Sequence, residues 1–282
     1  MHAENPTPGR FFLLGMQKSG TTWLQTLLDS HPAIICRNEG GFQQFASALA
    51  RAIGEYDGFV EARADVFGKE GYPHMTPREV RALYRTFLDG RMLPDRATKP
   101  GLRWVGDKDP NHGQEVRLLL DVLPEARFVQ IIRDGRDQAV SSWHHLHRIH
   151  GQRAALRFPE FGGFALRLAA DWAMGIRSIR TELAAAGAPY CEVRYEDLLA
   201  EPRGSLRRVL AFFEVASDEE TISACLSSAD FERLSGRRPG QEDRASFFRK
   251  GVAGDWRSLM DDRLSAEYVR RTGGLMAELG YA

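Results

Sequence analysis

The sequence is short of cysteine, carries no net charge and contains no long apolar run, and each shortage excludes a class of protein. Its 38 Lys and Arg residues balance its 38 Asp and Glu residues, which removes any global electrostatic argument for binding nucleic acid or acidic membranes. No uncharged stretch is long enough to span a bilayer, and the first ten residues have no apolar signal segment. We therefore expect a cytoplasmic protein with neither nucleic acid nor a membrane among its partners.

The few potential metal ligands argue against a metal site. Cys36, Cys191 and Cys225 are odd in number and far apart, so we expect reduced, buried thiols in a reducing compartment. A histidine-rich stretch repeats every third residue, but on a helix this spacing drifts around the surface, and no carboxylate or cysteine completes a ligand set. We expect these histidines to line an acceptor cavity instead: His144, His145, His147 and His150.

Short β-like runs alternate with helical patterns, which favours a parallel sheet covered on both faces. The expected strands cover residues 11–14, 33–36, 103–105, 127–132 and 190–194, and the uniformly apolar run 127–132 is expected to be central. The length of 282 residues suits one large core, so we predict a single domain over residues 1–282. The predicted fold class is α/β: a three-layer, P-loop-like fold with a central parallel sheet flanked by helices.

Several helix boundaries are marked by capping residues. The Thr-Pro-Arg-Glu segment at 76–79 combines an N-cap, a first-turn proline and a capping-box glutamate, and predicts a helix that ends near residue 90. Ser217 and Glu220 repeat the capping-box spacing. A helix over 164–186 should stop at Gly187.

The stretch Gly-Met-Gln-Lys-Ser-Gly-Thr-Thr at 15–22 has two glycines at P-loop spacing, between an apolar strand and a helix. Such a loop points backbone N–H groups and a helix N-terminus at an anion. In nucleotide triphosphatases a lysine follows the second glycine, whereas here Thr21 stands there and Lys18 lies inside the loop. The pattern predicts a less highly charged phosphate group, with Lys18 as a point charge at the transferring end. A plain glycine turn with a solvated Lys18 is the alternative.

A second basic signal follows the predicted strand 127–132. Arg133 stands at the end of the strand, where open α/β sheets bind ligands, and its planar guanidinium suits a phosphate dianion. If a helix begins at Gly135, Arg133 and Ser141 can face the same anion. An ion pair between Arg133 and a nearby aspartate is the alternative.

A third basic signal is Arg-Lys-Gly at 249–251. It lies in a charged, glycine-rich stretch, 241–254, which we expect to form a surface loop able to close over a site. Two adjacent cations followed by glycine suit a flexible clamp for an anion, although alone they would be an ordinary basic turn.

Together these segments resemble the sulfotransferase family that uses 3'-phosphoadenosine 5'-phosphosulfate (PAPS). The motifs are K-S-G-T-T-W at 18–23, R-D-x-R-D-x-x-x-S at 133–141, Y-E-D-L at 195–198 and R-K-G-x-x-G-D-W at 249–256, in the family's order. The resemblance implies an enzyme that moves a sulfuryl group in line from PAPS to a hydroxyl of a small-molecule or sugar acceptor. It further implies release of 3'-phosphoadenosine 5'-phosphate (PAP) and no metal.

The resemblance also implies roles for individual residues. Those that hold the 5'-phosphosulfate are Lys18, Ser19, Gly20, Thr21 and Thr22. Trp23 would stack on or near the adenine with Tyr195 beside the base, whereas without the family both aromatics would be expected in the core. Those that hold the 3'-phosphate are Arg133, Ser141, Arg249, Lys250 and Gly251.

Sulfuryl transfer also needs a base near the acceptor hydroxyl and positive charge on the leaving oxygen, where Lys18 is placed. Cytosolic members carry a K-x-H histidine, but Pro110 stands at that position here, and D-K-D-P at 107–110 is closer to N-K-D-P of the tyrosylprotein sulfotransferases. That branch also has a segment like L-D-S-H-P, at 28–32, leading to a catalytic glutamate. The resemblance therefore implies Glu39 as the base and Lys108 as a second cation; the further candidates for the base are His112 and then Asp109.

Two other functions remain open. A P-loop kinase or nucleotide hydrolase would bind adenosine triphosphate with magnesium, and a non-catalytic nucleotide-binding protein would keep the loops but lack a base. The acceptor pocket is expected from 40–100 and 146–163. The phenylalanines of these stretches suit a ring-bearing acceptor or equally a core: Phe42, Phe45, Phe59, Phe158 and Phe161. The sequence does not predict an oligomeric state.

Overall fold

The computed structural model describes residues 7–68, 72–93 and 99–281. Its core is a parallel sheet of five strands in the order β2-β3-β1-β4-β5. The strands are β1 (Gly9–Leu14), β2 (Ile34–Asn38), β3 (Trp104–Lys108), β4 (Arg127–Ile132) and β5 (Tyr190–Arg194). Every predicted strand is confirmed to within three residues at each end. β1 occupies the middle, and β4 is internal, paired with β1 and β5.

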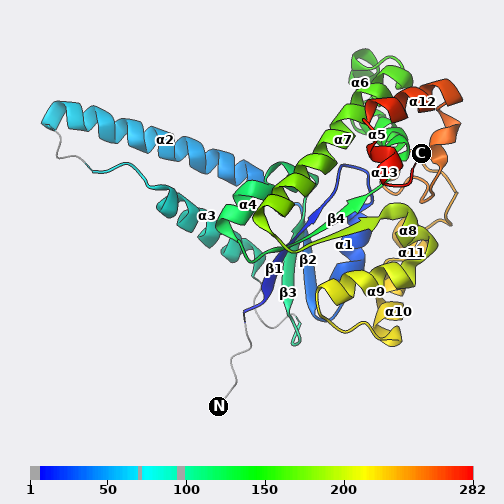
Figure 1. Ribbon diagram of the computed structural model, residues 1–282, viewed down its shortest axis with the longest axis horizontal. Coiled ribbons are helices and arrows are strands. Elements are labelled where there is room, and N and C mark those ends of the chain that lie inside the picture. Colours follow the sequence, from blue (N-terminus) through cyan, green and yellow to red (C-terminus); the bar gives the residue numbers. More distant parts are fainter. Residues whose placement is uncertain (1–6, 69–71, 94–98, 282) are drawn as a thin grey trace.

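The sheet forms the middle of three layers (Figure 1). One face packs against α1 (Thr21–Asp29), α9 (Pro202–Phe212) and α10 (Glu219–Ser228). The other face packs against α3 (Pro77–Met92), α4 (Val116–Val122) and α7 (Phe161–Ala186). The strands read as continuous apolar runs because both of their faces are covered: Phe11 contributes to the first layer and Phe12 to the second, and both are fully buried. The predicted α/β fold class is thereby confirmed.

Two of the predicted helix boundaries are confirmed and one is wrong. α3 carries the predicted capping box at 76–79, and α7 ends at Gly187 in the left-handed conformation as predicted. The predicted N-cap of α10 is wrong by one residue. The carboxylate of Asp218, rather than the hydroxyl of Ser217, accepts from the backbone N–H of Thr221 at 2.9 Å.

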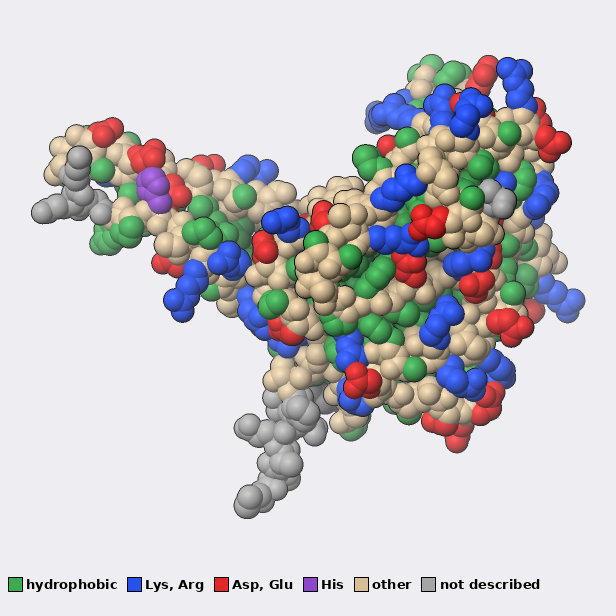
Figure 2. Space-filling view, viewed as in Figure 1, with side chains coloured by type: hydrophobic (Ala, Val, Ile, Leu, Met, Phe, Trp, Pro, Cys, Tyr) green, Lys and Arg blue, Asp and Glu red, His purple; other side chains and the backbone are tan. Residues whose placement is uncertain are grey.

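Two helices extend away from the body. α2 (Phe42–Phe67) runs outward as a long arm, and α3 returns towards the sheet (Figures 1 and 2). Only Phe42 and Val60 of α2 are buried. The arm therefore contributes little to the core beyond its first turn.

The C-terminal part packs beside the end of the sheet. A third apolar cluster joins α5 (Gly135–His150), α7, α12 (Asp262–Arg271) and α13 (Leu275–Glu278). The remaining helical segments are η1 (Pro110–Gln114), α6 (Gln152–Arg157), α8 (Tyr195–Ala200), α11 (Phe231–Ser235) and η2 (Asp255–Ser258). Within the described part of the chain, no helix combines the length and the apolar character needed to cross a membrane.

The three cysteines are free. Cys36 and Cys225 are buried as expected, while Cys191 is half-buried, which corrects the expectation that all three thiols are enclosed. Burial raises the pKa of Cys36 well above its usual value, so this thiol stays protonated and unreactive.

Candidate active site

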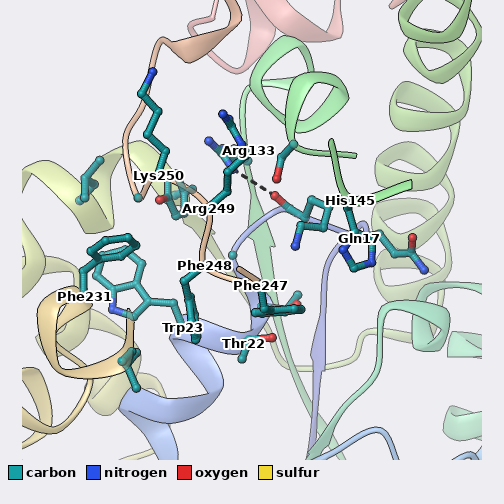
Figure 3. A pocket seen from close by; sticks show the side chains of 18 of the residues that line it. Gln17, Thr22, Trp23, Arg133, His145, Phe231, Phe247, Phe248, Arg249 and Lys250 are labelled. Carbon is teal, nitrogen blue, oxygen red and sulfur yellow. Dashed lines mark hydrogen bonds between the residues drawn. The ribbon is translucent and has the colours of Figure 1, made fainter. Parts of the chain in front are cut away.

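The carboxyl ends of the parallel strands surround a cavity of about 350 Å³ (Figure 3). Its walls come from the segments that follow each of the five strands, together with residues of α5, α8 and α11 and a loop near the C-terminus. Open α/β sheets place ligand sites at this edge. The predicted site residues that line the cavity are Lys18, Gly20, Thr21, Thr22, Trp23, Glu39, Lys108, Arg133, Ser141, Tyr195, Arg249, Lys250 and Gly251.

The loop after β1 is shaped to receive an anion. Gly20 is the N-cap of α1 with φ 102°, and no side chain caps the helix, so its first N–H groups lack intrahelical partners. A Cβ atom on Gly20 would lie 2.6 Å from Cδ2 of Tyr195, so no larger residue fits. The Ser19 hydroxyl is buried and has no hydrogen-bond partner among the described residues. Ser19 itself does not line the cavity.

Lys18 occupies a left-handed backbone conformation (φ 68°) inside this loop. Its ammonium lies 4.1 Å from the centroid of the Phe247 ring, within the range of a cation–π contact. Burial, with added repulsion from Arg148, Arg133 and Arg249, lowers the pKa of Lys18 from 10.5 to about 8. The Lys18 side chain is thus half-buried among other cations rather than fully solvated.

Arg133 directly follows the last residue of β4 and is held by several contacts. Its terminal nitrogens donate to the carbonyl oxygens of Lys18 (3.3 Å) and Val252 (3.0 Å), and its guanidinium covers the Tyr195 ring at 4.5 Å. Asp137 lies 3.9 Å away, and it accepts from the N–H groups of Gly254 and Trp256 at 2.7 and 2.8 Å. Asp137 is thus engaged mainly with the C-terminal loop. The Nε of Arg133 remains buried without a partner among the described residues.

The Arg-Lys-Gly segment forms part of an irregular loop over the cavity. Arg249 and Lys250 both form ion pairs with the buried carboxylate of Asp255, whose pKa these pairs hold below its usual value against the opposing effect of burial. Gly251 has φ 67°, and a Cβ there would lie 2.5 Å from the Phe231 ring. The ion pairs with Asp255 thus hold the two cations of the loop, and the close approach of Gly251 to Phe231 holds the residue after them.

Trp23 and Tyr195 belong to both the core and the cavity. Their rings meet edge to face at 5.7 Å, and the indole N–H of Trp23 donates to the carbonyl of Ala229 at 3.0 Å. Tyr195 is 7% exposed and packs in the first apolar cluster, yet both residues line the cavity. The two alternatives for these aromatics are thus not exclusive.

Lys108, the last residue of β3, forms an ion pair with Glu39, which directly follows β2. Nζ of Lys108 lies 2.7 Å from Oε1 of Glu39; the lysine side chain is 1% exposed and the glutamate side chain 54%. Glu39 has a left-handed backbone (φ 52°), and its N–H donates to the carbonyl of Lys108 at 2.8 Å. The strand pairing of β2 with β3 therefore brings both candidate catalytic residues together.

The structure does not place His112 in the cavity wall. Its ring is buried in η1, where Nε2 lies 2.9 Å from Asp107 and Nδ1 lies 3.5 Å from Glu115. Burial opposes protonation, but these carboxylates raise the pKa of His112 overall. Asp109 is also buried and caps η1. The interpretation of either residue as the base is corrected, because their neighbours point them into the protein.

The expected acceptor aromatics are likewise not in the cavity wall. Phe42 lies in the second apolar cluster and Phe45 stacks on Phe87 at 3.6 Å, while Phe59 is exposed on the arm. Phe158 and Phe161 pack on neighbouring aromatic side chains of α5 and α7. Of the four histidines on α5, only His145 lines the cavity. The described residues contain no group of three or more metal-ligating side chains.

Sequence reasoning missed much of the apolar wall. The additional lining residues are Gln17, Pro110, Leu199, Phe231, Leu234, Pro239, Phe247, Phe248 and Val252. Phe247 and Phe248 directly precede the Arg-Lys-Gly segment, and this adjacency was the one signal that could have revealed them. Phe231 and Leu234 come from α11, which carries no motif.

Comparison with known proteins supports a single family. The family model described as "Sulfotransferase family" matches residues 8–219. The omega-hydroxy-beta-dihydromenaquinone-9 sulfotransferase Stf3 of Mycobacterium bovis is 36% identical over 107 residues, which are 36% of this chain and 26% of that protein. Protein-tyrosine sulfotransferase A of Caenorhabditis elegans is 22% identical over 240 residues, 82% of this chain and 58% of that protein. The chain thus spans between a quarter and three fifths of these two relatives.

Solved structures resemble the whole chain. Mouse sulfotransferase SULT7A1 complexed with PAP aligns with a TM-score of 0.55 and 16% identity, covering 95% of this chain and 85% of that one. The sulfotransferase domain of the Synechococcus PCC 7002 olefin synthase aligns with a TM-score of 0.53 and 20% identity, covering 98% and 97%. At these identities the likeness establishes the shared fold.

Proposed function

Because the chain belongs to the sulfotransferase family, we propose that it transfers the sulfuryl group of PAPS to a hydroxyl of a small-molecule or sugar acceptor. The observation that carries the proposal is the convergence of three basic motifs on one cavity. Lys18, Arg133 and Arg249 come from distant parts of the sequence, yet all line the same 350 Å³ space. That volume lies within the range of small-ligand pockets.

The chemistry of the cavity fits PAPS. Arg133 and Arg249 line the cavity, and the Nε atoms of both are buried without hydrogen-bond partners among the described residues; such groups are costly unless a ligand satisfies them. The loop after β1 would hold the 5'-phosphosulfate through its N–H groups and Lys18. Arg133, Ser141 and the Arg-Lys-Gly segment would hold the 3'-phosphate, with the adenine against Trp23 and Tyr195.

PAPS supplies an activated sulfuryl group attached to a phosphate leaving group. The ammonium of Lys18 would neutralise the charge that develops on the bridging oxygen, as preorganised cations do in other group transfers. Glu39 would accept the proton of the acceptor hydroxyl, since its carboxylate is half-exposed in the cavity wall. Lys108, buried beneath it, would orient that carboxylate and place a second positive charge beside the reacting group.

The cytoplasm is the compartment we propose, because Cys36, Cys191 and Cys225 are free thiols. The acceptor is proposed to be a small molecule. This rests on the largely apolar wall formed by residues such as Phe247 and Phe248. No observation favours a P-loop kinase or a nucleotide hydrolase.

A nucleotide-binding experiment tests the donor assignment. Isothermal titration calorimetry with PAP in EDTA should show one tight site, and adenosine triphosphate with magnesium should bind far more weakly. The protein should also release PAP from PAPS when a hydroxyl acceptor is present. Tight magnesium-dependent binding of the triphosphate together with no affinity for PAP would contradict the proposal.

A further inference from the structure

A small hollow adjoins the main cavity and is lined by four cationic side chains, those of Lys18, Arg148, Arg244 and Arg249. It is lined by Lys18, Ser141, His144, His145, Arg148, Arg244, Ser246, Phe247 and Arg249, and we call it the cationic hollow. Five of these residues also line the main cavity. The two spaces are therefore continuous at Lys18.

The cations of the two spaces differ in their ion pairs. In the main cavity Lys108 pairs with Glu39, while Arg249 and Lys250 pair with Asp255. Arg148 and Arg244 lie outside these pairs, and both side chains are solvent-exposed.

Little in the protein neutralises these two arginines. Among the described residues Arg148 lies within ion-pair distance of no carboxylate, and Arg244 has only Glu242, at 3.5 Å, which also pairs with Arg249 at 2.6 Å. No Asp or Glu lines the hollow. Arg148 also repels the charge of Lys18. Burial lowers the pKa of Lys18 most, and Arg148 lowers it more than any other neighbouring charge does.

His145 adds a neutral donor to the same place. Nη2 of Arg148 lies 3.2 Å from Nδ1 of His145, and because a guanidinium only donates, Nδ1 must be the unprotonated nitrogen. The proton of the neutral ring therefore sits on Nε2. Burial and the charges of Lys18 and Arg148 lower the pKa of His145 to about 4, so the ring is neutral at physiological pH.

We propose that the cationic hollow binds an anionic group of the acceptor, so that the preferred substrates are hydroxyl compounds that also carry a carboxylate. The inference rests on the proposed sulfotransferase function and names its substrate class. The hollow itself has room for about one oxygen atom. The body of the acceptor would lie in the main cavity, with its charged end reaching Arg148, Arg244 and the Nε2–H of His145.

Matched acceptor pairs test this class. The first pair is 4-hydroxybenzoate and its methyl ester, and the second is 3-hydroxybutyrate and its methyl ester. Each member keeps the hydroxyl and differs in charge. Dissociation constants are measured on the full chain with and without saturating PAP, and Michaelis constants are measured with PAPS.

The wild type should bind at least one acid about tenfold more tightly than its ester, the effect of one charge-assisted contact. Arg148→Gln should remove most of this preference, and Arg244→Gln, whose side chain is 73% exposed, should reduce it about twofold to fivefold. PAP affinity should stay within twofold in both variants. Arg153→Gln, which removes an exposed arginine of α6, is the matched control and should change neither value.

Three results would overturn the inference: equal or no binding of acid and ester by the wild type, an unchanged preference in Arg148→Gln, or a tenfold loss of PAP affinity in that variant. The last would assign Arg148 to the donor site. Failure of the proposed function is distinguishable, because it would show as absent PAP binding while the preference for acids, measured without nucleotide, persists.

Discussion

The buried ammonium of Lys108 lies 2.7 Å from the half-exposed carboxylate of Glu39. Lys108 is enclosed by the protein and Glu39 faces the cavity, so the buried lysine fixes the position of the carboxylate. A buried cation without its partner is strongly destabilising, and Glu39 is therefore held in the cavity wall. The same contact gives the carboxylate an orientation before any ligand binds.

Glu39→Gln should lower the turnover number by about a hundredfold to ten-thousandfold, the usual contribution of a general base. PAP affinity should remain within twofold, because the proposed phosphate ligands are other residues. Stopped-time assays of sulfuryl transfer and calorimetry measure the two effects. Glu55→Gln, on the exposed side of α2, is the control and should leave both unchanged. A large loss of PAP affinity in Glu39→Gln would point to a structural role instead.

Arg133→Ala should weaken PAP binding by about 1.5–3 kcal/mol, the contribution of a hydrogen bond to a charged group. Calorimetry gives the dissociation constant, and thermal unfolding shows whether the contacts to the Lys18 and Val252 carbonyls also matter for stability. Arg133→Lys keeps the charge but not the planar fork, so it should recover part of the affinity. Arg167→Ala, exposed on α7, is the matched control. Unchanged affinity in Arg133→Ala would remove this residue from the proposed 3'-phosphate site.

The strands and the glycine loop were predictable because local sequence determines them. An apolar run such as Phe11 to Leu14 must be buried on both faces, and the loop after it must end at the same edge of the sheet as those after the other parallel strands. That edge brought Lys18 and Arg133 together from positions far apart in the sequence. The predicted sheet thus led to the correct neighbourhood for the site.

Side-chain direction was the part that sequence could not supply. His112 follows Lys108 closely, but the turn of η1 directs its ring to Asp107 and Glu115, inside the protein. Phe231 reaches the cavity because Gly251 lets the loop pass against its ring, a tertiary contact with no local signal. Contacts between residues far apart in the sequence determine these side-chain directions, and the periodicity of the sequence does not reveal such contacts.

Gly106→Ala should lower the free energy of unfolding by about 1–3 kcal/mol, the usual cost of overpacking a core. The added Cβ would lie 2.3 Å from the Phe11 ring, between the neighbouring strands β1 and β3. Urea denaturation measures the change. Gly101→Ala is the control, since nothing lies within 4 Å of its added Cβ. Equal stability of the two variants would show that β1 and β3 are less tightly packed than the structure indicates.

PAP affinity should depend on the protonation of Lys18. Burial and neighbouring cations lower its pKa to about 8, so the side chain is mostly charged below that pH and mostly neutral above it. A bound anion favours the charged form, and affinity should therefore be constant at lower pH and fall above about pH 8, by at most about tenfold per pH unit. Calorimetry between pH 6.5 and 9.5 measures the profile, and buffers of different ionisation enthalpy should reveal proton uptake at the high end. Lys18→Arg, which stays charged throughout, should flatten the profile, whereas a pH-independent affinity of the wild type would separate Lys18 from the anion.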